Sequence, residues 1–326
     1  MDIYYVNEVP MTGLNDLSEL MGEESPKGVC LFDMSQLALA TALVNFEDKQ
    51  PINTNMIRHL VLNTVKFNVK KFKAQYPNVI LAFDNAEGGY WRRDYGYYYK
   101  KNRAKHREES TWDFEGYFAG MKAIVEEFPK HMPYMSLNIP RIEADDIIGV
   151  LVIMLTLAGI PVMIVSSDGD YTQLHSYGDV KQWAPQLKKF VKSKSGDARI
   201  DLFTKLLKGD KKDNVASVRV RSDFWYTVEE GERTPAMKTS VIEACAAASD
   251  DDEIKEILEK AYPNDKNIFE RYQENLIMIS MSHIPDDIVA LIKDSYNNYK
   301  PAPRSRMYSY FVKNALSNHM KNINEF

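Results

Sequence analysis

Aspartates follow short apolar stretches of this chain at three separate places, and carboxyl groups arranged in this way could bind metal ions. The stretches are GVCLFD at 28–33, VILAFD at 79–84 and PVMIVSSD at 161–168, and they end at Asp33, Asp84 and Asp168. Short β-branched runs of this kind are typical of buried parallel strands, whose carboxyl ends open into one ligand-binding crevice. The pattern therefore predicts that three carboxylates point into one site.

Further acids extend this set, namely Glu143, Asp145, Asp146, Asp170, Asp210 and Asp213. Gly169 separates Asp168 from Asp170 and lets the chain turn, so that both acids can face one site. Asp210 and Asp213 lie three residues apart and share one face if the segment is helical. Asp146 has a second explanation, because an acid in the first turn of a helix complements the helix dipole.

This many carboxylates predicts the hydrolysis of a phosphodiester. Two metal ions roughly 4 Å apart can activate a water and neutralise charge on the phosphate. Magnesium prefers oxygen ligands, and a crowded set of acids cannot stay ionised without cations because like charges raise one another's pKa. Zinc ligation, a serine or cysteine triad and a phosphate-binding loop have no matching pattern, since the two cysteines and six histidines are not closely spaced.

The segment 90–107, YWRRDYGYYYKKNRAKHR, is rich in both cations and aromatic rings. Between Trp91 and Arg107 it has seven lysines and arginines against one aspartate, a local charge of +6. Cations bind phosphates and aromatic faces stack on unpaired bases, so the mixture suits single-stranded or junction nucleic acid. A basic amphipathic helix on the surface is the alternative. The position of the segment directly after Asp84 favours the nucleic-acid interpretation.

The elements that must position these residues form an α/β pattern followed by a helical one. Apolar spacing predicts helices at 55–74 and 143–157, between the strands. Beyond about residue 190 the strand patterns end, and helices are expected at 200–207, 239–248, 252–261 and 267–279. The acids at 249–253 are interpreted as a helix start with capping residues. We therefore expect an α/β domain with a mainly parallel sheet and flanking helices at 1–190, and a smaller α-helical domain at 191–326.

Composition excludes several classes of protein. A chain of 326 residues suits two domains, and a net charge of −5 argues against a simple basic coat protein for nucleic acid. Cys30 and Cys245 lie far apart, which fits a reducing cytosol. Residues 147–165 are almost uncharged, but Gly159 and Pro161 divide them into a helix and a strand, so no membrane span is expected. Residues 1–10 lack the apolar core of a secretion signal.

Together these residues resemble the 5′-nuclease family, which includes flap endonucleases and the exonuclease domain of bacterial DNA polymerase I. Within it the chain is most similar to the ribonucleases H of tailed phages. The resemblance extends from about Gly28 to Phe326 and rests on LFDMSQ, AFDNAEGGYWRRDYGYYYKKNR, EADD, SSDGDYTQLH and LKGDKKDNVASV. It implies a 5′-nuclease (PIN-like) fold and two Mg²⁺ ions, for which we expect Mn²⁺ to substitute.

The resemblance also implies roles for individual residues. Around the first metal it places Asp33, Asp84, Glu143, Asp145 and Asp168, with Asp146 as a further candidate. The second metal would be served, partly through water, by Asp170, Asp210 and Asp213. Lys100 and Arg103 match a lysine and an arginine at the base of an arch that contact the scissile phosphate, and residues 102–111 would belong to that arch. The other residues expected to bind nucleic acid are Arg92, Arg93, Tyr99, Lys101, Lys105, Arg107, Lys208, Lys211 and Lys212.

The segment after Asp213 departs from the family's pattern. In the family, the positions of Gly209 and Asp210 open a helix-turn-helix unit whose backbone amides hold duplex phosphates. The usual glycine-rich continuation is replaced here by SVRVRSDFWY at 217–226. We therefore expect the monovalent-ion site and the mode of duplex binding to differ from the common pattern, as fits the phage branch.

The function implied is a magnesium-dependent 5′-3′ exonuclease and flap endonuclease. It would remove RNA primers and adjacent DNA from 5′ ends during phage lagging-strand replication. Its substrates would be DNA and RNA–DNA hybrids with 5′ ends and forked or flap DNA. It would act as a monomer in the host cytosol, with a single-strand DNA-binding protein and a sliding clamp as candidate partners.

Two other classes stay open. A toxin-like ribonuclease with a related acidic sheet would be a small single domain, so the helical half argues against it. A non-catalytic, structure-specific DNA-binding protein would keep the basic segment but would not need the full set of acids.

Overall fold

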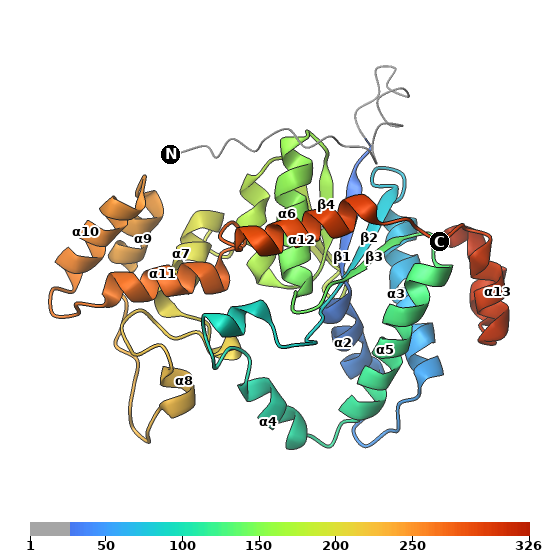
Figure 1. Ribbon diagram of the computed structural model, residues 1–326, viewed down its shortest axis with the longest axis horizontal. Coiled ribbons are helices and arrows are strands. Elements are labelled where there is room, and N and C mark those ends of the chain that lie inside the picture. The colour runs from blue at the N-terminus through green and yellow to red at the C-terminus, as the bar shows by residue number, and fades with distance from the viewer. Residues whose placement is uncertain (1–26) are drawn as a thin grey trace.

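Six strands form one sheet through the middle of the molecule, with helices on both of its faces (Figure 1). The computed structural model describes residues 27–326, so the expectation for residues 1–10 lies outside the described residues. Across the sheet the strands are β3 (Met135–Asn138), β2 (Asn78–Phe83), β1 (Val29–Asp33), β4 (Val162–Val165), β5 (Val180–Ala184) and β6 (Lys189–Phe190). The first five are parallel, and β6 pairs antiparallel with β5.

The three strands predicted from the sequence lie next to one another at the centre of the sheet. β1 pairs with β2 on one side and with β4 on the other. Every residue of these three strands except Asn78 is buried, which explains why each strand is a nearly continuous apolar run. The predicted mainly parallel α/β fold is confirmed. The strands β3, β5 and β6 were not predicted.

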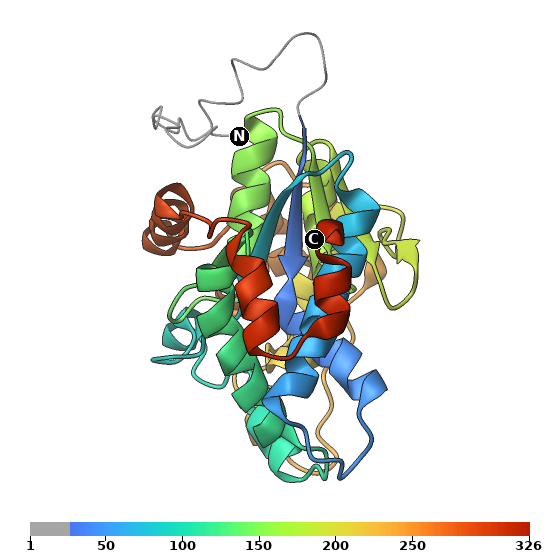
Figure 2. The same ribbon diagram turned by 90° about the vertical axis from the view of Figure 1, so that its right-hand side faces the viewer.

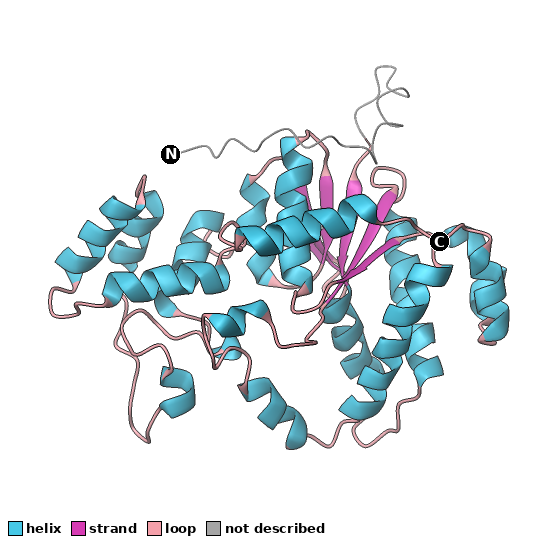
Figure 3. Cartoon of the chain, in the orientation of Figure 1, coloured by secondary structure: helices cyan, strands magenta, loops and turns pink. Residues whose placement is uncertain are grey.

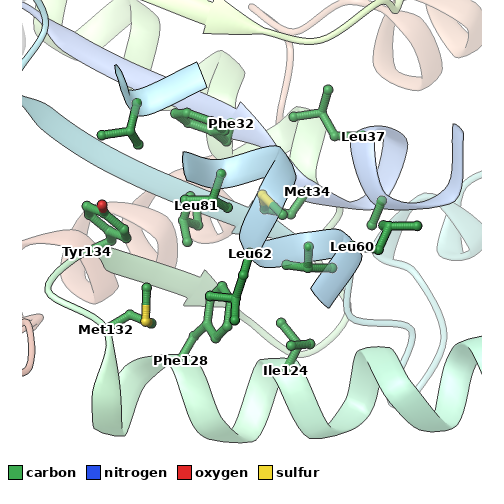
Figure 4. Packing of buried hydrophobic residues seen from close by; sticks show 14 of the residues in the cluster. Phe32, Met34, Leu37, Leu60, Leu62, Leu81, Ile124, Phe128, Met132 and Tyr134 are labelled. Carbon is green, nitrogen blue, oxygen red and sulfur yellow. The ribbon is translucent and has the colours of Figure 1, made fainter. Parts of the chain in front are cut away.

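The helices on one face of the sheet are α2 (Met34–Asn45), α3 (Thr54–Phe72) and α5 (Phe114–His131). Their apolar side chains pack on alternate residues of the strands, and Figure 4 shows Phe32 and Leu81 on one side of this core with Ile124 and Phe128 of α5 on the other. The helices α3 and α5 approach closely at Gly120, where an added Cβ would lie 2.5 Å from the Ile57 side chain.

The other face is covered by α6 (Ala144–Leu157) and α12 (Asp286–Asn298). After α6 the chain turns through Gly159, at φ +73°, and enters β4, so the predicted helix, turn and buried strand are confirmed. Among the described residues, no helix has the length and apolar character needed to cross a membrane.

A separate helical unit begins after β6 and has its own hydrophobic core, around Phe203, Leu206, Ile242, Leu258 and Tyr272. In Figure 3 it is the part of the molecule without strands, on the left. Its helices are α7 (Ala198–Lys208), α8 (Phe224–Thr227), α9 (Thr239–Ala247), α10 (Asp251–Ala261) and α11 (Ile268–Ile279). All four helices predicted here are present. Asp250 caps α10 by accepting a hydrogen bond from Glu253 N–H at 2.9 Å, so the acids at 249–253 do start a helix.

The chain returns to the sheet after α11. The last elements are α12, α13 (Arg306–Lys313), α14 (Ser317–Lys321) and the 3₁₀ turn η4 (Ile323–Glu325). Met307 and Phe311 are fully buried in the same core as α3 and α5, and Figure 2 shows the red C-terminal helices beside these two. The division at residue 190 stays a prediction, but the segment after about residue 280 shares its cores with the α/β part.

Candidate active site

Asp33 ends β1 and also caps α2, so its carboxylate is held at the carboxyl edge of the sheet. One oxygen accepts a hydrogen bond from Gln36 N–H at 3.0 Å, and the other accepts one from the Tyr171 hydroxyl at 3.0 Å. The side chain is buried, and Asp84 and Asp168 lie near it. Burial and then these two charges raise the pKa of Asp33 to about 7.

Asp84 follows β2 and reaches the amino end of α6. Ala82 of β2 pairs with Asp33 in the sheet register, so Asp84 lies two residues beyond that level. Its Oδ1 accepts a hydrogen bond from Ala144 N–H at 2.8 Å, as expected where the free amides of a helix start attract anions. Burial and then the charge of Glu143 raise the pKa of Asp84.

Glu143 caps α6 and is surrounded by cationic and hydroxyl donors. It accepts hydrogen bonds from Arg92 Nη1 at 2.8 Å, from the Tyr99 hydroxyl at 3.0 Å and from the Lys100 ammonium. Burial acts to raise the pKa of Glu143, but Lys100 and Arg92 outweigh burial and hold it below its usual range. Glu143 therefore stays ionised in the interior.

Asp145 lies in the first turn of α6, where one oxygen each of Glu143, Asp145 and Asp146 come within 4.8 Å of one another. Burial and then the charge of Glu143 raise the pKa of Asp145 well above its usual range. Its Oδ1 is buried without a hydrogen-bond partner among the described residues, although Arg92 Nη1 lies 3.8 Å away. An additional cation at this point would stabilise the ionised form.

Asp146 faces a different set of groups, inside the protein. Its Oδ2 accepts hydrogen bonds from the Trp91 indole N–H at 2.8 Å and from Glu143 N–H at 3.1 Å, and its Oδ1 forms an ion pair with Arg92 Nη2 at 2.8 Å. Oδ2 is therefore hydrogen-bonded, whereas Oδ1 has the Arg92 ion pair but no hydrogen bond from a described residue. This geometry favours a role for Asp146 in holding Arg92 over the predicted role as a metal ligand.

Lys100 joins Glu143 to the far side of the site. Its ammonium contacts Glu143 and lies 3.6 Å from Asp213 Oδ2, while Arg103 Nη2 lies 2.5 Å from Asp213 Oδ1. Lys100 has φ +55°, a conformation that non-glycine residues rarely adopt, and its N–H donates to the Asp213 carbonyl at 3.0 Å. This turn directs the ammonium inward, toward the carboxylates.

Asp170 and Asp210 form a second group of acids around Lys205. Asp170 belongs to the 3₁₀ segment η2 (Gly169–Ser176), which Asp168 caps by accepting a hydrogen bond from Asp170 N–H at 3.0 Å. Asp210 caps the short turn η3 (Lys211–Asp213). The Lys205 ammonium contacts Asp170 and lies 2.7 Å from Asp210 Oδ2.

The two groups of acids meet at one small cavity of about 20 Å³. Its lining includes Asp145 of α6, Asp170 and Asp210 of the group around Lys205, and Asp213, which pairs with Lys100 and Arg103. A much larger cavity, of about 1690 Å³, lies between α6, α12 and the amino ends of the strands, and none of these acids lines it. The strand-end acids Asp33, Asp84 and Asp168 do not line the small cavity, although Asp84 and Asp168 lie close enough to raise the pKa of Asp33.

The residues predicted to bind nucleic acid divide by exposure. Arg92 is 2% exposed, is paired with Glu143 and Asp146, and donates to the Met278 carbonyl, so its burial does not favour the predicted contact with nucleic acid. Tyr99 is 3% exposed and its hydroxyl donates to Glu143, so its burial does not favour the predicted contact either. The residues with accessible side chains are Arg93, Lys101, Lys105, Arg107, Lys208, Lys211 and Lys212.

The segment expected to form an arch contains a short helix, α4 (Asn102–Glu108), after the 3₁₀ turn η1 (Trp91–Asp94). In Figure 1, α4 lies along the lower edge of the molecule, between the side that holds the helical unit and α5. The helix expected to follow Gly209 is only the single turn η3, closed by mutual backbone hydrogen bonds of 2.9 Å between Asp210 and Val215. The unit therefore departs from a helix-turn-helix where the sequence does.

Two residues that the sequence did not single out complete the site. Tyr171 hydrogen-bonds to Asp33, and Lys205 bridges Asp170 and Asp210. Tyr171 follows Asp170 directly, which is a weak signal for its place near the acids. Nothing local marks Lys205, because its contact with Asp170 depends on how α7 packs against η2.

The donor set fits divalent cations. The carboxylate oxygens of these acids are hard ligands of the kind that Mg²⁺ prefers, and the side chains described at this site offer it no sulfur or imidazole ligand. Several carboxyls are held in surroundings that disfavour their charge, since the pKa values of Asp33, Asp84 and Asp145 are all raised by burial. A bound cation would reverse that effect.

Known proteins match both halves of the chain. Residues 17–200 match the 5′-3′ exonuclease N-terminal resolvase-like domain, and residues 196–326 match the family described as T4 RNase H, C terminal. The ribonuclease H of Enterobacteria phage T4 is 55% identical over 312 residues, which are 95% of this chain and 100% of that protein.

Solved structures share the fold at low sequence identity. A bacteriophage T5 flap endonuclease in complex with DNA and metal ions has a TM-score of 0.57 and 16% identity, covering 82% of this chain and 98% of that one. A T5 5′-exonuclease with bound zinc has a TM-score of 0.56 and 17% identity, covering 84% and 100%.

Proposed function

The chain belongs to the 5′-nuclease family of 5′-3′ exonucleases and phage ribonuclease H, and from this premise we propose that it is a magnesium-dependent nuclease acting on 5′ ends. It removes RNA primers and adjacent DNA during phage lagging-strand synthesis, by exonuclease and flap endonuclease cleavage. The observation that carries this proposal is that Asp145, Asp170, Asp210 and Asp213 line one small cavity, with Lys100 and Arg103 paired to Asp213.

The acids divide into two sets by position. At the first ion we place the group around the strand ends and the start of α6, which consists of Asp33, Asp84, Glu143, Asp145 and Asp168. At the second we place Asp170, Asp210 and Asp213, some of them through water. Two Mg²⁺ ions, for which Mn²⁺ substitutes, supply activation of a water and neutralisation of charge on the phosphate.

Lys100 and Arg103 act on the scissile phosphate in this proposal. Burial acts to lower the pKa of Lys100, but Tyr99, Glu143 and Asp213 outweigh it and raise that pKa well above its usual range. The side chain is therefore a permanent cation, held beside the cluster by a backbone turn and two carboxylates. Such a preorganised charge stabilises the charge that develops on a phosphate in the transition state.

The nucleic acid is proposed to run along two surfaces that flank the acids. On α4 the exposed side chains of Lys105 and Arg107 would contact the single-stranded 5′ end, near the exposed ring of Tyr97. On the helical unit, Lys208 at the end of α7 and Lys211 and Lys212 in η3 would contact duplex phosphates. The enzyme would work as a monomer in the host cytosol. A single-strand DNA-binding protein and a sliding clamp are the proposed partners.

The proposed function is tested by digesting a 5′-labelled DNA flap and an RNA–DNA hybrid with Mg²⁺, with and without EDTA. Short products from the 5′ end of both substrates, absent with EDTA, are expected. Asp213→Asn should severely reduce cleavage while binding largely survives, because Asp213 is assigned to the second ion and pairs with Lys100 and Arg103. Full magnesium-dependent activity of this variant would refute the two-metal assignment.

Lys100→Ala is expected to slow the single-turnover rate by roughly 10²-fold or more, as when one preorganised transition-state donor is removed. Its effect on substrate binding should be much smaller, because the ammonium is buried among carboxylates and not presented on the surface. Rapid-quench kinetics with enzyme in excess would measure the rate.

Lys101→Ala is the matched control, since the Lys101 ammonium lies over the Tyr97 ring at 3.0 Å from its centre. This variant should weaken binding and leave the single-turnover rate nearly unchanged. An unchanged single-turnover rate in Lys100→Ala would remove Lys100 from the proposed chemistry.

A further inference from the structure

Lys205 lies between two acids that come from different parts of the fold. It projects from α7 of the helical unit, and its ammonium contacts Asp170 Oδ1 and lies 2.7 Å from Asp210 Oδ2. Asp170 is on η2, beside the sheet, while Asp210 follows α7. Through these two contacts a single ammonium bridges the helical unit to the edge of the sheet, and its side chain is only 34% exposed.

The position of this ammonium is one that a metal ion would also favour. Asp170 and Asp210 both point oxygens at it, and both line the small cavity that Asp145 and Asp213 share. Without a cation between them the two carboxylates would repel each other, and Asp168 adds a third negative charge close to Asp170. One positive charge between the two acids is therefore favourable, whether it belongs to a lysine or to a metal.

We propose that Lys205 is a positioning residue that serves as a tethered counter-ion for Asp170 and Asp210. It holds these two carboxylates in place in the metal-free enzyme, and it competes with the second divalent cation for them. The inference rests on the proposed function, because it concerns the second metal. It adds a role for a residue outside the acids and for a cation that the protein itself supplies.

Competition of this kind lowers the affinity of the protein for the second ion below its affinity for the first. The cation can take both carboxylates only when the Lys205 ammonium moves away, so part of its binding free energy is spent on breaking two ion pairs. In the first set, Lys100 and Arg92 already contact Glu143, but Asp145 Oδ1 has no hydrogen-bond partner among the described residues. An ion can therefore reach that oxygen without first breaking a hydrogen bond.

The test measures the affinity of the full chain for Mn²⁺ without nucleic acid. Electron paramagnetic resonance gives the concentration of the free ion at each step of the titration. Wild-type protein is expected to bind one ion tightly and a second more weakly. Lys205→Met should tighten the second site at least about tenfold, because one unit of positive charge next to the ion is removed. Lys205→Arg, which keeps the charge, should retain the wild-type affinity.

Lys208→Met is the matched control, because Lys208 is on the same helix, is exposed and forms no ion pair with a described residue. It removes the same charge without touching the carboxylates, so the second-site affinity should change less than about twofold. A long-range charge effect would instead change both variants alike and would overturn the proposal.

Denaturation provides the second readout. In EDTA, Lys205→Met should unfold at a lower urea concentration than wild type, and saturating Mn²⁺ should close that gap because the ion replaces the ammonium. If Lys205 were only structural, the gap would persist in Mn²⁺ and the second site would be unchanged or weaker in Lys205→Met. If this variant does not fold, Lys205→Gln takes its place with the same expectations.

The outcomes also separate this inference from the proposed function. Two sites of unchanged affinity in Lys205→Met would overturn the role of Lys205 and leave the two-metal proposal standing. A single site in both wild type and Lys205→Met would overturn the two-metal proposal, and the inference with it. Two sites in the variant and one in wild type would support the inference, since the lysine would then exclude the second ion.

Discussion

Asp145→Asn is expected to lower magnesium-dependent cleavage by roughly 10³-fold, the loss typical when a preorganised electrostatic contact to the transition state is removed. Asp145 lines the cavity where the two acid groups meet, and its Oδ1 is buried without a hydrogen-bond partner among the described residues. An asparagine has the same shape but no charge. It would bind a hard divalent cation much more weakly, although the site would otherwise be unchanged.

The same substitution should not reduce the stability of the metal-free protein. Burial and the charge of Glu143 raise the pKa of Asp145 in the folded state above its ordinary value of 3.8, so the folded protein holds this proton more tightly than the unfolded chain. Stability from this group is therefore lost as the pH rises above about 4. The asparagine side chain carries no such charge, and the variant should be at least as stable as wild type in EDTA at neutral pH.

Activity and denaturation measured on one preparation would check both halves of this prediction. Asp252→Asn is the matched control, because Asp252 also lies in the first turn of a helix, α10, but with an exposed side chain. It should retain wild-type cleavage. A variant at Asp145 that cleaves normally in Mg²⁺ would contradict its assignment to the metal site. One that is unfolded would contradict the assigned effect of this partly buried charge.

Arg92→Met is expected to destabilise the protein by about 3–5 kcal/mol, the cost of breaking a buried ion pair from one side. Arg92 is 2% exposed and lies 2.8 Å from both Glu143 and Asp146, which are also buried. Without it the two carboxylates would share the interior with fewer compensating charges. Cleavage should fall as well, because Arg92 helps to orient Glu143 at the site.

Urea denaturation in EDTA and in Mg²⁺ would measure this effect. Mg²⁺ should recover only part of the loss, because Asp146 faces Trp91 and Arg92 inside the protein. Arg221→Met is the control, since Arg221 pairs with Glu232 on the exposed surface and its removal should change the midpoint little. Equal midpoints for Arg92→Met and wild type would show that the buried pairs contribute no net stability.

The positions of the acids could be predicted because the information is local. A strand that is buried on both faces must be apolar, so an aspartate directly after it stands out, as Asp33 and Asp84 do. Parallel strands then bring those ends to one edge without any further assumption. Apolar spacing likewise located the helices α3, α6 and α7, and capping acids located the start of α10.

Basic residues were harder to assign, because a charge on the chain does not reveal where it points. Arg92 and Lys105 belong to the same cationic segment, yet Arg92 is buried among carboxylates and Lys105 is exposed. What separates them is the fold of the turn that precedes α4, including the left-handed backbone of Lys100. The return of the C-terminal helices to the sheet was missed for a related reason, since an amphipathic helix does not specify its partner.

The amino-acid sequence by itself determined that this protein has an acid-tipped parallel sheet, a cationic aromatic segment after its second predicted strand and a helical second half. These features follow from periodicity and from residue types next to one another in the chain. The tertiary structure alone decided which acids face the cavity, that Asp146 turns to Arg92, and that Lys205 bridges Asp170 and Asp210. Those contacts join side chains from separate elements, and their energies depend on burial and distance, which exist only after the chain has packed.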